Sequence, residues 1–457
     1  MTKTVEESKI VRIIFIALLL DLLSFTIILP LFPRLLEFYK STDTSKDSLL
    51  SYFAHCLDEY KQLTGMVSNK RWDTVMLGGF IGSLFSFLQF IVSPILGHAS
   101  DRFGRRAVLL CTMIGNIVST CLWCFANTFS WFLTARIIGG LSEGNVQLSI
   151  AMISDVTSKE RRSKHMALVG IAFAIAFTAG PPLGAWLASI DLTQQAWALP
   201  GMYPYSMAAL VALLLLLIET IYLFTQLPET SSQPAPSSDS NKSKKNKPSP
   251  TATTTKADPG LSQKQNDNLW NLGLVQCMFT FLFSGMEFTL VFLTYDVLSY
   301  SHLQQGKLLG FMGIASAMIQ GGYVRRKRQQ EKTLAVQGMI LGTFGLASLA
   351  LVGLQLGALA TSVCLYCGVL CLAFTSGTVV NSLTSLASLQ SQQDQGKHLG
   401  LFRSFGQLGR ALGPLSACTV YWILGPVWTY GIGAMCLSLL AINSVVSLPS
   451  SRQIKTD

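Results

Sequence analysis

The sequence predicts an all-α membrane protein whose twelve transmembrane helices form two six-helix bundles. Only 13% of the 457 residues are charged, about half of the roughly 25% typical of soluble domains. Twelve stretches are long and apolar enough to cross a bilayer, which takes roughly 20 residues of helix. The two halves of the chain also resemble each other. This combination excludes a soluble enzyme and a disordered chain.

The first predicted span is full length and leads into a stop-transfer pattern, so we expect it to be retained rather than cleaved as a signal peptide. Residues 34–73 are expected to form a loop that contains a short helix near 46–63. Residues 231–268, rich in Ser, Pro, Thr and Lys, are expected to form a disordered linker between bundles 1–230 and 269–457. The spans are 11–33, 75–99, 107–127, 130–152, 166–188, 204–227, 269–295, 307–324, 334–354, 358–386, 399–424 and 428–448.

The positive charge predicts the orientation of these spans. Basic residues cluster in the loops 101–106, 158–164 and 325–328, and the linker adds six lysines. Loops rich in Lys and Arg stay in the cytoplasm. We therefore expect both termini and the linker to be cytoplasmic and residues 34–73 to lie on the other side. Topology accounts for the net charge of +10, so no nucleic-acid partner is expected.

An internal repeat favours duplication of a six-helix unit. A Lys-His pair precedes a Gly-Pro pair by sixteen residues in both halves. Two such halves joined by a central linker are typical of secondary transporters, with the substrate site near mid-membrane between them. At an offset of 233 residues, Lys164-His165 matches Lys397-His398, and Gly180-Pro181 matches Gly413-Pro414.

The segment after the second span resembles the G-x-x-x-D-R-x-G-R-R signature of the major facilitator superfamily. Its glycines permit a tight turn and a close helix approach. Its carboxylate can pair with nearby arginines or face a helix N-terminus. The resemblance implies the major facilitator fold and a loop that latches the cytoplasmic gate; the alternative is a merely basic loop. The motif residues are Gly97, Asp101, Arg102, Gly104, Arg105 and Arg106.

Further motifs resemble the drug:proton antiporter branch of this family. In span 5, residues 180–184 resemble the antiporter motif, which places Gly-Pro at a closely packed bend, although Ala176 and Ala185 replace glycines often found there. Asp21 in span 1 and Pro228-Glu229 after span 6 also fit this branch. The expected helix-bend residues in spans 5 and 11 are Gly180, Pro181, Gly184, Gly413 and Pro414.

At a finer level the chain is similar to a tetracycline-transporter-like group within the superfamily. That resemblance implies organic anions, including anionic drugs, as substrates. It also implies the plasma membrane or an endomembrane such as the nuclear envelope. The segments that carry it are 20–23, 139–142, 283–287, 304–307 and 401–406.

Seven ionisable residues fall inside the predicted spans, where a charge is costly and tends to face a cavity or a partner. A buried carboxyl can carry the coupled proton, and an arginine can attract an anion. The alternative is a static set of ion pairs that fixes helix register; for Glu219 we favour a peripheral or headgroup position. Proton-coupling candidates are Asp21, Glu143 and Glu287, and candidates for substrate binding or ion pairing are Arg136, Arg410, Arg403, Gln89 and Gln320.

No catalytic motif is present, so we expect no enzyme activity, no cofactor and no metal site. The prediction is a secondary active transporter of small organic solutes that works by alternating access and is coupled to protons. The alternative is a transport-inactive membrane scaffold or receptor on the same fold. Expected partners are an organic solute, protons and the lipid bilayer; the oligomeric state stays open, and a monomer is compatible.

Overall fold

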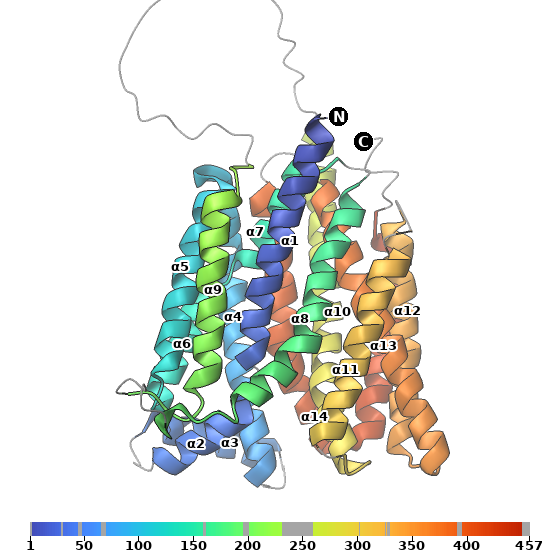
Figure 1. Cartoon of the computed structure of the whole chain (residues 1–457). Helices are drawn as coiled ribbons and strands as arrows, with labels where there is room; N and C mark the ends of the chain where they lie inside the picture. The colour runs from blue at the N-terminus through green and yellow to red at the C-terminus, as the bar shows by residue number, and fades with distance from the viewer. Residues whose placement is uncertain are drawn as a thin grey trace, which may run out of the picture.

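The computed structural model describes residues 2–28, 31–43, 48–64, 70–158, 161–194, 201–230, 259–300, 302–324, 326, 330–390 and 395–449, and within them the regular secondary structure is helical (Figure 1). The first half contains α1 (Thr2–Ile28), α2 (Phe32–Thr42), α3 (Leu49–Thr64), α4 (Lys70–Phe103), α5 (Arg105–Cys124), α6 (Phe129–Ser142), α7 (Asn145–Val156), α8 (Arg162–Leu187), the short 3-10 helix η2 (Leu192–Gln194) and α9 (Ser206–Gln226). The second half contains α10 (Pro259–Asp296), α11 (His302–Met318), the π-helical segment η3 (Ile319–Val324), α12 (Glu331–Gly353), α13 (Ala358–Gln390) and α14 (Gln395–Ser447).

The predicted fold class is confirmed. Within the described residues, nine helices are long and apolar enough to cross a membrane. One of them, α14, carries two predicted spans because its backbone leaves the helical conformation at Gly425 (φ 81°, ψ 174°). The predicted span 130–152 is divided between α6 and α7, and the span 307–324 between α11 and η3. The helices thus account for every predicted span.

The two halves stand side by side (Figure 1). Helix α4 packs against α14, and α8 packs against α11 and α13, so these helices form the contact between the halves. Helix α1 begins and α14 ends at one end of the bundle, which we call the terminal end. Helices α2 and α3 lie at the opposite end, which we call the α2–α3 end.

One boundary differs from the prediction, and one helix was not predicted. The linker was predicted to extend to residue 268, but α10 already begins at Pro259. The apolar pattern ends where a span leaves the bilayer, whereas the helix continues through polar residues such as Gln263 and Asn268. Linker residues 231–258 lie outside the described residues. Helix α3 coincides with the short helix expected near 46–63, whereas α2 was not predicted.

Helix α2 is held by an aromatic core at the α2–α3 end. Its Tyr39 is fully buried, and the phenol donates a 2.6 Å hydrogen bond to the carbonyl oxygen of Ala126. The same ring lies 6.1 Å from the ring of Phe129 and 5.5 Å from that of Phe132, which are typical separations for aromatic pairs. This packing explains why the amphipathic segment 32–42 forms a helix against the bundle.

Candidate functional site

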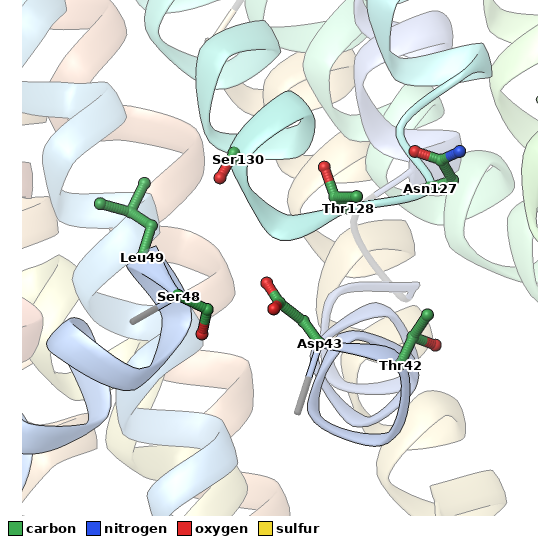
Figure 2. A pocket seen from close by; sticks show the side chains of 7 residues that line it. All are labelled: Thr42, Asp43, Ser48, Leu49, Asn127, Thr128 and Ser130. Carbon is green, nitrogen blue, oxygen red and sulfur yellow. The ribbon is translucent and has the colours of Figure 1, made fainter. Parts of the chain in front are cut away.

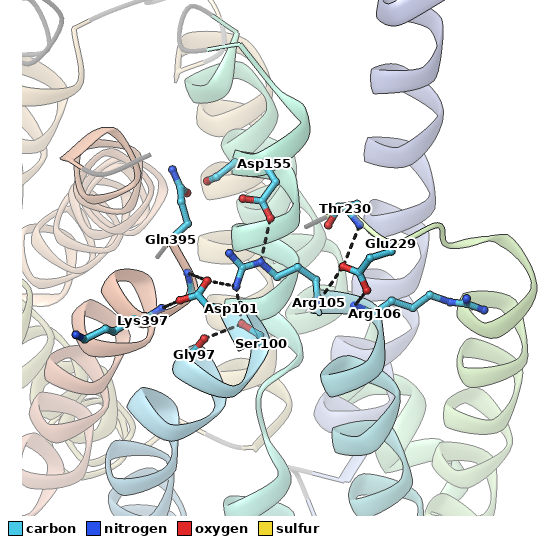
Figure 3. A network of polar contacts seen from close by, with 12 residues as sticks. Gly97, Ser100, Asp101, Arg105, Arg106, Asp155, Glu229, Thr230, Gln395 and Lys397 are labelled. Atoms are coloured by element: carbon cyan, nitrogen blue, oxygen red, sulfur yellow. Dashed lines mark hydrogen bonds and ion pairs between the residues drawn. The ribbon is translucent and has the colours of Figure 1, made fainter. Parts of the chain in front are cut away.

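At the terminal end, Asp101 joins the two halves (Figure 3). Its carboxylate accepts hydrogen bonds from the backbone amides of Gly396 (2.9 Å) and Lys397 (2.7 Å), the first turn of α14. An anion is favourable there because the first amides of a helix lack intrahelical partners and carry partial positive charge. The predicted motif residue Asp101 therefore caps a helix of the other half.

The backbones of α4 and α14 touch beside this cap. A Cβ atom added to Gly97 would lie 2.1 Å from the carbonyl oxygen of Gly396 and 3.2 Å from the Cα atom of Gly400. Any side chain at position 97 would separate the two helices. The glycine that begins the motif is therefore needed for the contact between the halves at this end.

Arg105 binds two carboxylates of the first half. Its Nη1 atom lies 2.7 Å from Asp101 Oδ1 and its Nε atom 2.9 Å from Asp155 Oδ2. The guanidinium is buried and also donates a 2.6 Å hydrogen bond to Ser100 Oγ. Burial raises the pKa of Asp155, and the charge of Arg105 partly opposes that rise. Arg105 thus connects α4, α5 and α7 next to the contact between Asp101 and the start of α14.

Glu229 completes the motif from the end of α9. Its carboxylate accepts hydrogen bonds from the backbone amides of Arg105 (2.8 Å) and Arg106 (3.2 Å) and so caps α5. Gly104 turns the chain at φ +94°, and a Cβ there would lie 2.7 Å from Glu229 Oε2. Arg106 Nη2 donates to the carbonyl of Phe224 at 2.6 Å, whereas Arg102 is exposed. From the sequence, Glu229 was expected only as a feature of the antiporter branch. Its role as the cap of α5 was not predicted.

A second charge of the first half reaches the second half. Arg162 is buried at the start of α8, and its Nη1 donates a 2.5 Å hydrogen bond to the carbonyl of Ser388 in α13. Its Nη2 donates to the carbonyl of Ser154 at 2.7 Å. Arg162 was not among the predicted site residues, because it lies in a basic loop that contains several similar charges.

Between the two ends of the bundle, Asp21 of α1 is buried and accepts a 2.8 Å hydrogen bond from Asn145 Nδ2. Asn145 begins α7 directly after the break that separates it from α6. Glu143 lies in that break, with extended backbone angles (φ −75°, ψ 92°), and accepts a 3.4 Å hydrogen bond from Asn116 Nδ2. Glu143 is therefore not part of the helix that carries Arg136, because α6 ends at Ser142.

Arginines surround this group of acids. Arg403 of α14, in the second half, lies within electrostatic range of both Glu143 and Asp21. Arg136 acts on Glu143 and places its guanidinium 4.0 Å from the ring centre of Phe85. The structure thus brings acids of one half to an arginine of the other half.

Two further candidates lie within the second half. Glu287 of α10 is half-buried and in electrostatic range of Arg410 of α14. The Arg410 side chain is exposed, whereas its neighbour Gly409 in sequence packs against α10. Arg410 also lies in electrostatic range of Arg403, so the two arginines connect Glu287 with the acids of the first half.

Glu219 does not occupy the peripheral position favoured from the sequence. Its side chain is 2% exposed on α9, and it lies within electrostatic range of Asp21 and Glu143. Counting residues along a helix gives the depth of a side chain but not the neighbour it faces, and α9 turns this carboxyl toward α1. The buried group therefore contains three carboxyls rather than two.

The two candidate glutamines differ. Gln89 is buried on α4. Gln320 lies in η3, donates to Ser316 Oγ at 3.1 Å, and accepts from Asn381 Nδ2 of α13 at 3.2 Å. Gln320 thus makes an interhelical hydrogen bond.

The helix-bend motifs are sites of close packing. Cβ atoms added to Gly180 and Gly184 would lie 2.0 Å from Thr26 Oγ1 and 1.8 Å from the carbonyl oxygen of Ile27, both on α1. In α14, a Cβ on Gly413 would lie 2.3 Å from the carbonyl oxygen of Phe281. Helices α8 and α14 both run on through their prolines, which include Pro181 and Pro414.

A pocket of about 350 Å³ opens at the α2–α3 end, between the end of α2, the start of α3 and the loop before α6 (Figure 2). The Asp43 carboxylate points into it, toward Thr128 and Ser130. It is widely open and lies away from the buried acids, so we do not assign it to the candidate site. Its lining residues are Thr42, Asp43, Ser48, Leu49, Asn127, Thr128 and Ser130.

The sequence profile of the Major Facilitator Superfamily matches residues 14–414. The chain belongs to the major facilitator superfamily. It is therefore a multi-pass membrane protein of a transporter family, which confirms the resemblance seen in its motifs.

Individual members of the superfamily are similar over nearly the whole chain. Major facilitator superfamily domain-containing protein 10 of Mus musculus is 36% identical over 429 residues, which cover 92% of this chain and 89% of the relative. The crystal structure of the human organic anion transporter MFSD10 (TETRAN) matches with a TM-score of 0.79 and 34% identity, covering 96% of this chain and 99% of that chain. The class B tetracycline resistance protein of Escherichia coli is 22% identical over 83% of this chain and 88% of its own length.

Proposed function

We propose that this protein is a proton-coupled transporter of organic anions that works by alternating access between two six-helix halves. The observation that carries the proposal is Arg403 of the second half acting on Asp21 and Glu143 of the first half. An ionised carboxylate in a buried site needs a compensating charge. Because the compensating arginine belongs to the other half, movement of the halves changes the charge that the acids experience.

The same arrangement links the proton to the anion. Arg403 compensates the ionised acids in the closed arrangement, and an organic anion would compete with them for this guanidinium. An acid that loses its arginine becomes neutral by taking up a proton. Anion binding and proton binding then favour each other, and this linkage is reciprocal. The similar human transporter is named for organic anions, which supports this substrate class.

The terminal end is the proposed gate of this cycle. Asp101 and Arg162 bind the ends of α14 and α13 across the two halves. Opening the gate would break these contacts and expose the buried charges at this end. Because Arg102, Arg105, Arg106, Arg161 and Arg162 lie at the terminal end, we propose that it faces the cytoplasm and that both termini are cytoplasmic.

Transport in liposomes tests the proposal. Purified protein is reconstituted, a pH gradient is imposed, and uptake of labelled organic anions and labelled organic cations is measured. We expect gradient-driven accumulation of anions in the wild type. Asp21→Asn, Glu143→Gln and Glu287→Gln are each tested alone, with Glu331→Gln as the control because Glu331 is a buried glutamate at the start of α12.

The outcomes separate the parts of the proposal. Gradient-driven accumulation that survives all three substitutions would remove these acids as proton sites. Accumulation of cations but not anions would contradict the substrate class. No gradient-dependent flux of any compound would favour the transport-inactive scaffold or receptor.

A further inference from the structure

Glu219 is buried without any neutralising partner that the described residues reveal. Its Oε2 atom is shielded from solvent and has no hydrogen-bond partner among the described residues. Its side chain is 2% exposed, and α9 packs closely against α1 and α5. A buried carboxylate that is neither paired nor hydrogen-bonded costs several kcal/mol, so this group is the least able of the three acids to carry a charge.

Within the described part of the chain, the charges that act on Glu219 are both negative. Asp21 comes from α1 and Glu143 from the break between α6 and α7. Among the described residues, α5 and α8, the other helices that touch α9, contribute no charge that acts on Glu219. Arg403 acts on Asp21 and Glu143 instead. The available positive charge thus serves the other two acids and leaves Glu219 uncompensated.

Carboxyls that share one buried site do not all ionise together, because each negative charge disfavours the next unless a nearby cation compensates it. We propose that Glu219 is a further proton-binding site of the transporter, which keeps its proton while Asp21 and Glu143 are ionised against Arg403. The inference rests on the proposed proton coupling and adds a residue to it. The three acids then ionise one after another. Glu219 contributes a bound proton to the transport cycle without contacting the anion.

Infrared spectroscopy of the purified protein tests this assignment without any transport assay. A protonated carboxyl has a C=O stretch that is separate from the carboxylate bands. At neutral pH we expect this band in the wild type, a reduced band in Glu219→Gln, and the wild-type band in the control Glu59→Gln, whose side chain is largely exposed. A band of full intensity in folded Glu219→Gln protein would overturn the assignment.

The pH profile of uptake provides the second readout. If Glu219 must be protonated, wild-type uptake falls at alkaline pH as that proton is lost. Glu219→Gln, which is always neutral, should reduce this fall, and Glu219→Asp should restore it. Should Glu219→Gln not fold, the infrared spectrum of Glu219→Asp is the test: the C=O stretch should change frequency because the protonated carboxyl is then an aspartic acid, and a band identical to that of the wild type would overturn the inference.

The two failures can be told apart. A wild type without gradient-driven uptake contradicts the proposed function, whatever the infrared result. A wild type that is driven by the gradient, with the same profile in Glu219→Gln, contradicts only the role of Glu219.

Discussion

The guanidinium of Arg162 donates a 2.5 Å hydrogen bond to the backbone carbonyl oxygen of Ser388, near the C-terminal end of α13. Carbonyls at that end of a helix carry partial negative charge and lack intrahelical donors. Asp101 makes the complementary contact at the N-terminal end of α14. A cation and an anion of the first half therefore each bind the helix end of opposite polarity in the second half.

Arg162→Gln should loosen the terminal end. Hydrogen bonds to charged groups contribute about 1.5–3 kcal/mol, which corresponds to a tenfold or greater rise in the open population. Hydrogen–deuterium exchange should show faster exchange of the last turn of α13 and the first turn of α8. The control is Arg161→Gln, because Arg161 is a more exposed neighbour whose ion pair with Glu7 is 3.6 Å long. Equal exchange in both variants would contradict a role of Arg162 in closure.

Gly97→Ala should keep the terminal end from closing. Its Cβ would lie 2.1 Å from the Gly396 carbonyl oxygen, and overpacking of this kind costs about 1–3 kcal/mol. The matched control is Gly82→Ala on the same helix, where a Cβ would meet nothing within 4 Å. Exchange at the start of α14 should rise in the first variant and not in the second. If exchange at the start of α14 were the same in Gly97→Ala as in the wild type, Gly97 would not be needed for closure of the terminal end.

Glu229→Ala should destabilise the start of α5. The loss of an N-terminal cap costs about 0.5–2 kcal/mol, and here two amides lose their acceptor. The thermal midpoint in detergent should fall, with exchange increasing first in α5. Glu59→Ala on α3 serves as the control, because that side chain is largely exposed. A midpoint as high as that of the control variant would exclude Glu229 as a structural cap.

Asp155→Asn should change how stability depends on pH. Burial raises the pKa of Asp155 in the folded protein, and this residue lies beyond the predicted span 130–152. A carboxyl with a raised pKa stabilises the fold below its unfolded pKa of about 3.9, and this contribution is lost as pH rises through the folded value. The thermal midpoint of Asp155→Asn relative to the wild type should therefore increase as pH rises and then level off. A difference that shrinks with rising pH would contradict the direction of the shift.

The sequence predicts the number and position of the spans well, because a bilayer requires long apolar segments and these can be recognised directly along the sequence. It does not predict where a span is interrupted. The break at Glu143-Gly144 and the π-helical segment η3 depend on tertiary contacts; for example, a Cβ on Gly144 would lie 2.6 Å from Leu96 Cδ1. Helix α2 was missed because its short amphipathic segment is stabilised by the aromatic core rather than by its own pattern.

The candidate site was predictable in its residue types but not in its pairings. Charged residues inside spans are rare enough to be found by inspection, and Asp21, Glu143 and Arg403 were found that way. Partners such as Asn116 and Asn145 were overlooked because a neutral amide in an apolar span is not unusual in itself. A search for amides together with charges would have found both residues.

The two copies of the internal repeat differ at the terminal end. Arg162 and Gln395 occupy matching positions 233 residues apart, and so do Asp155 and Ser388. Both Arg162 and Gln395 donate to the Ser388 carbonyl, whereas Asp155 binds Arg105. The first copy carries ions at these two positions and the second carries neutral groups. Arg162 can therefore bind the end of α13, whereas Gln395 at the matching position can only add a neutral hydrogen bond to the same carbonyl.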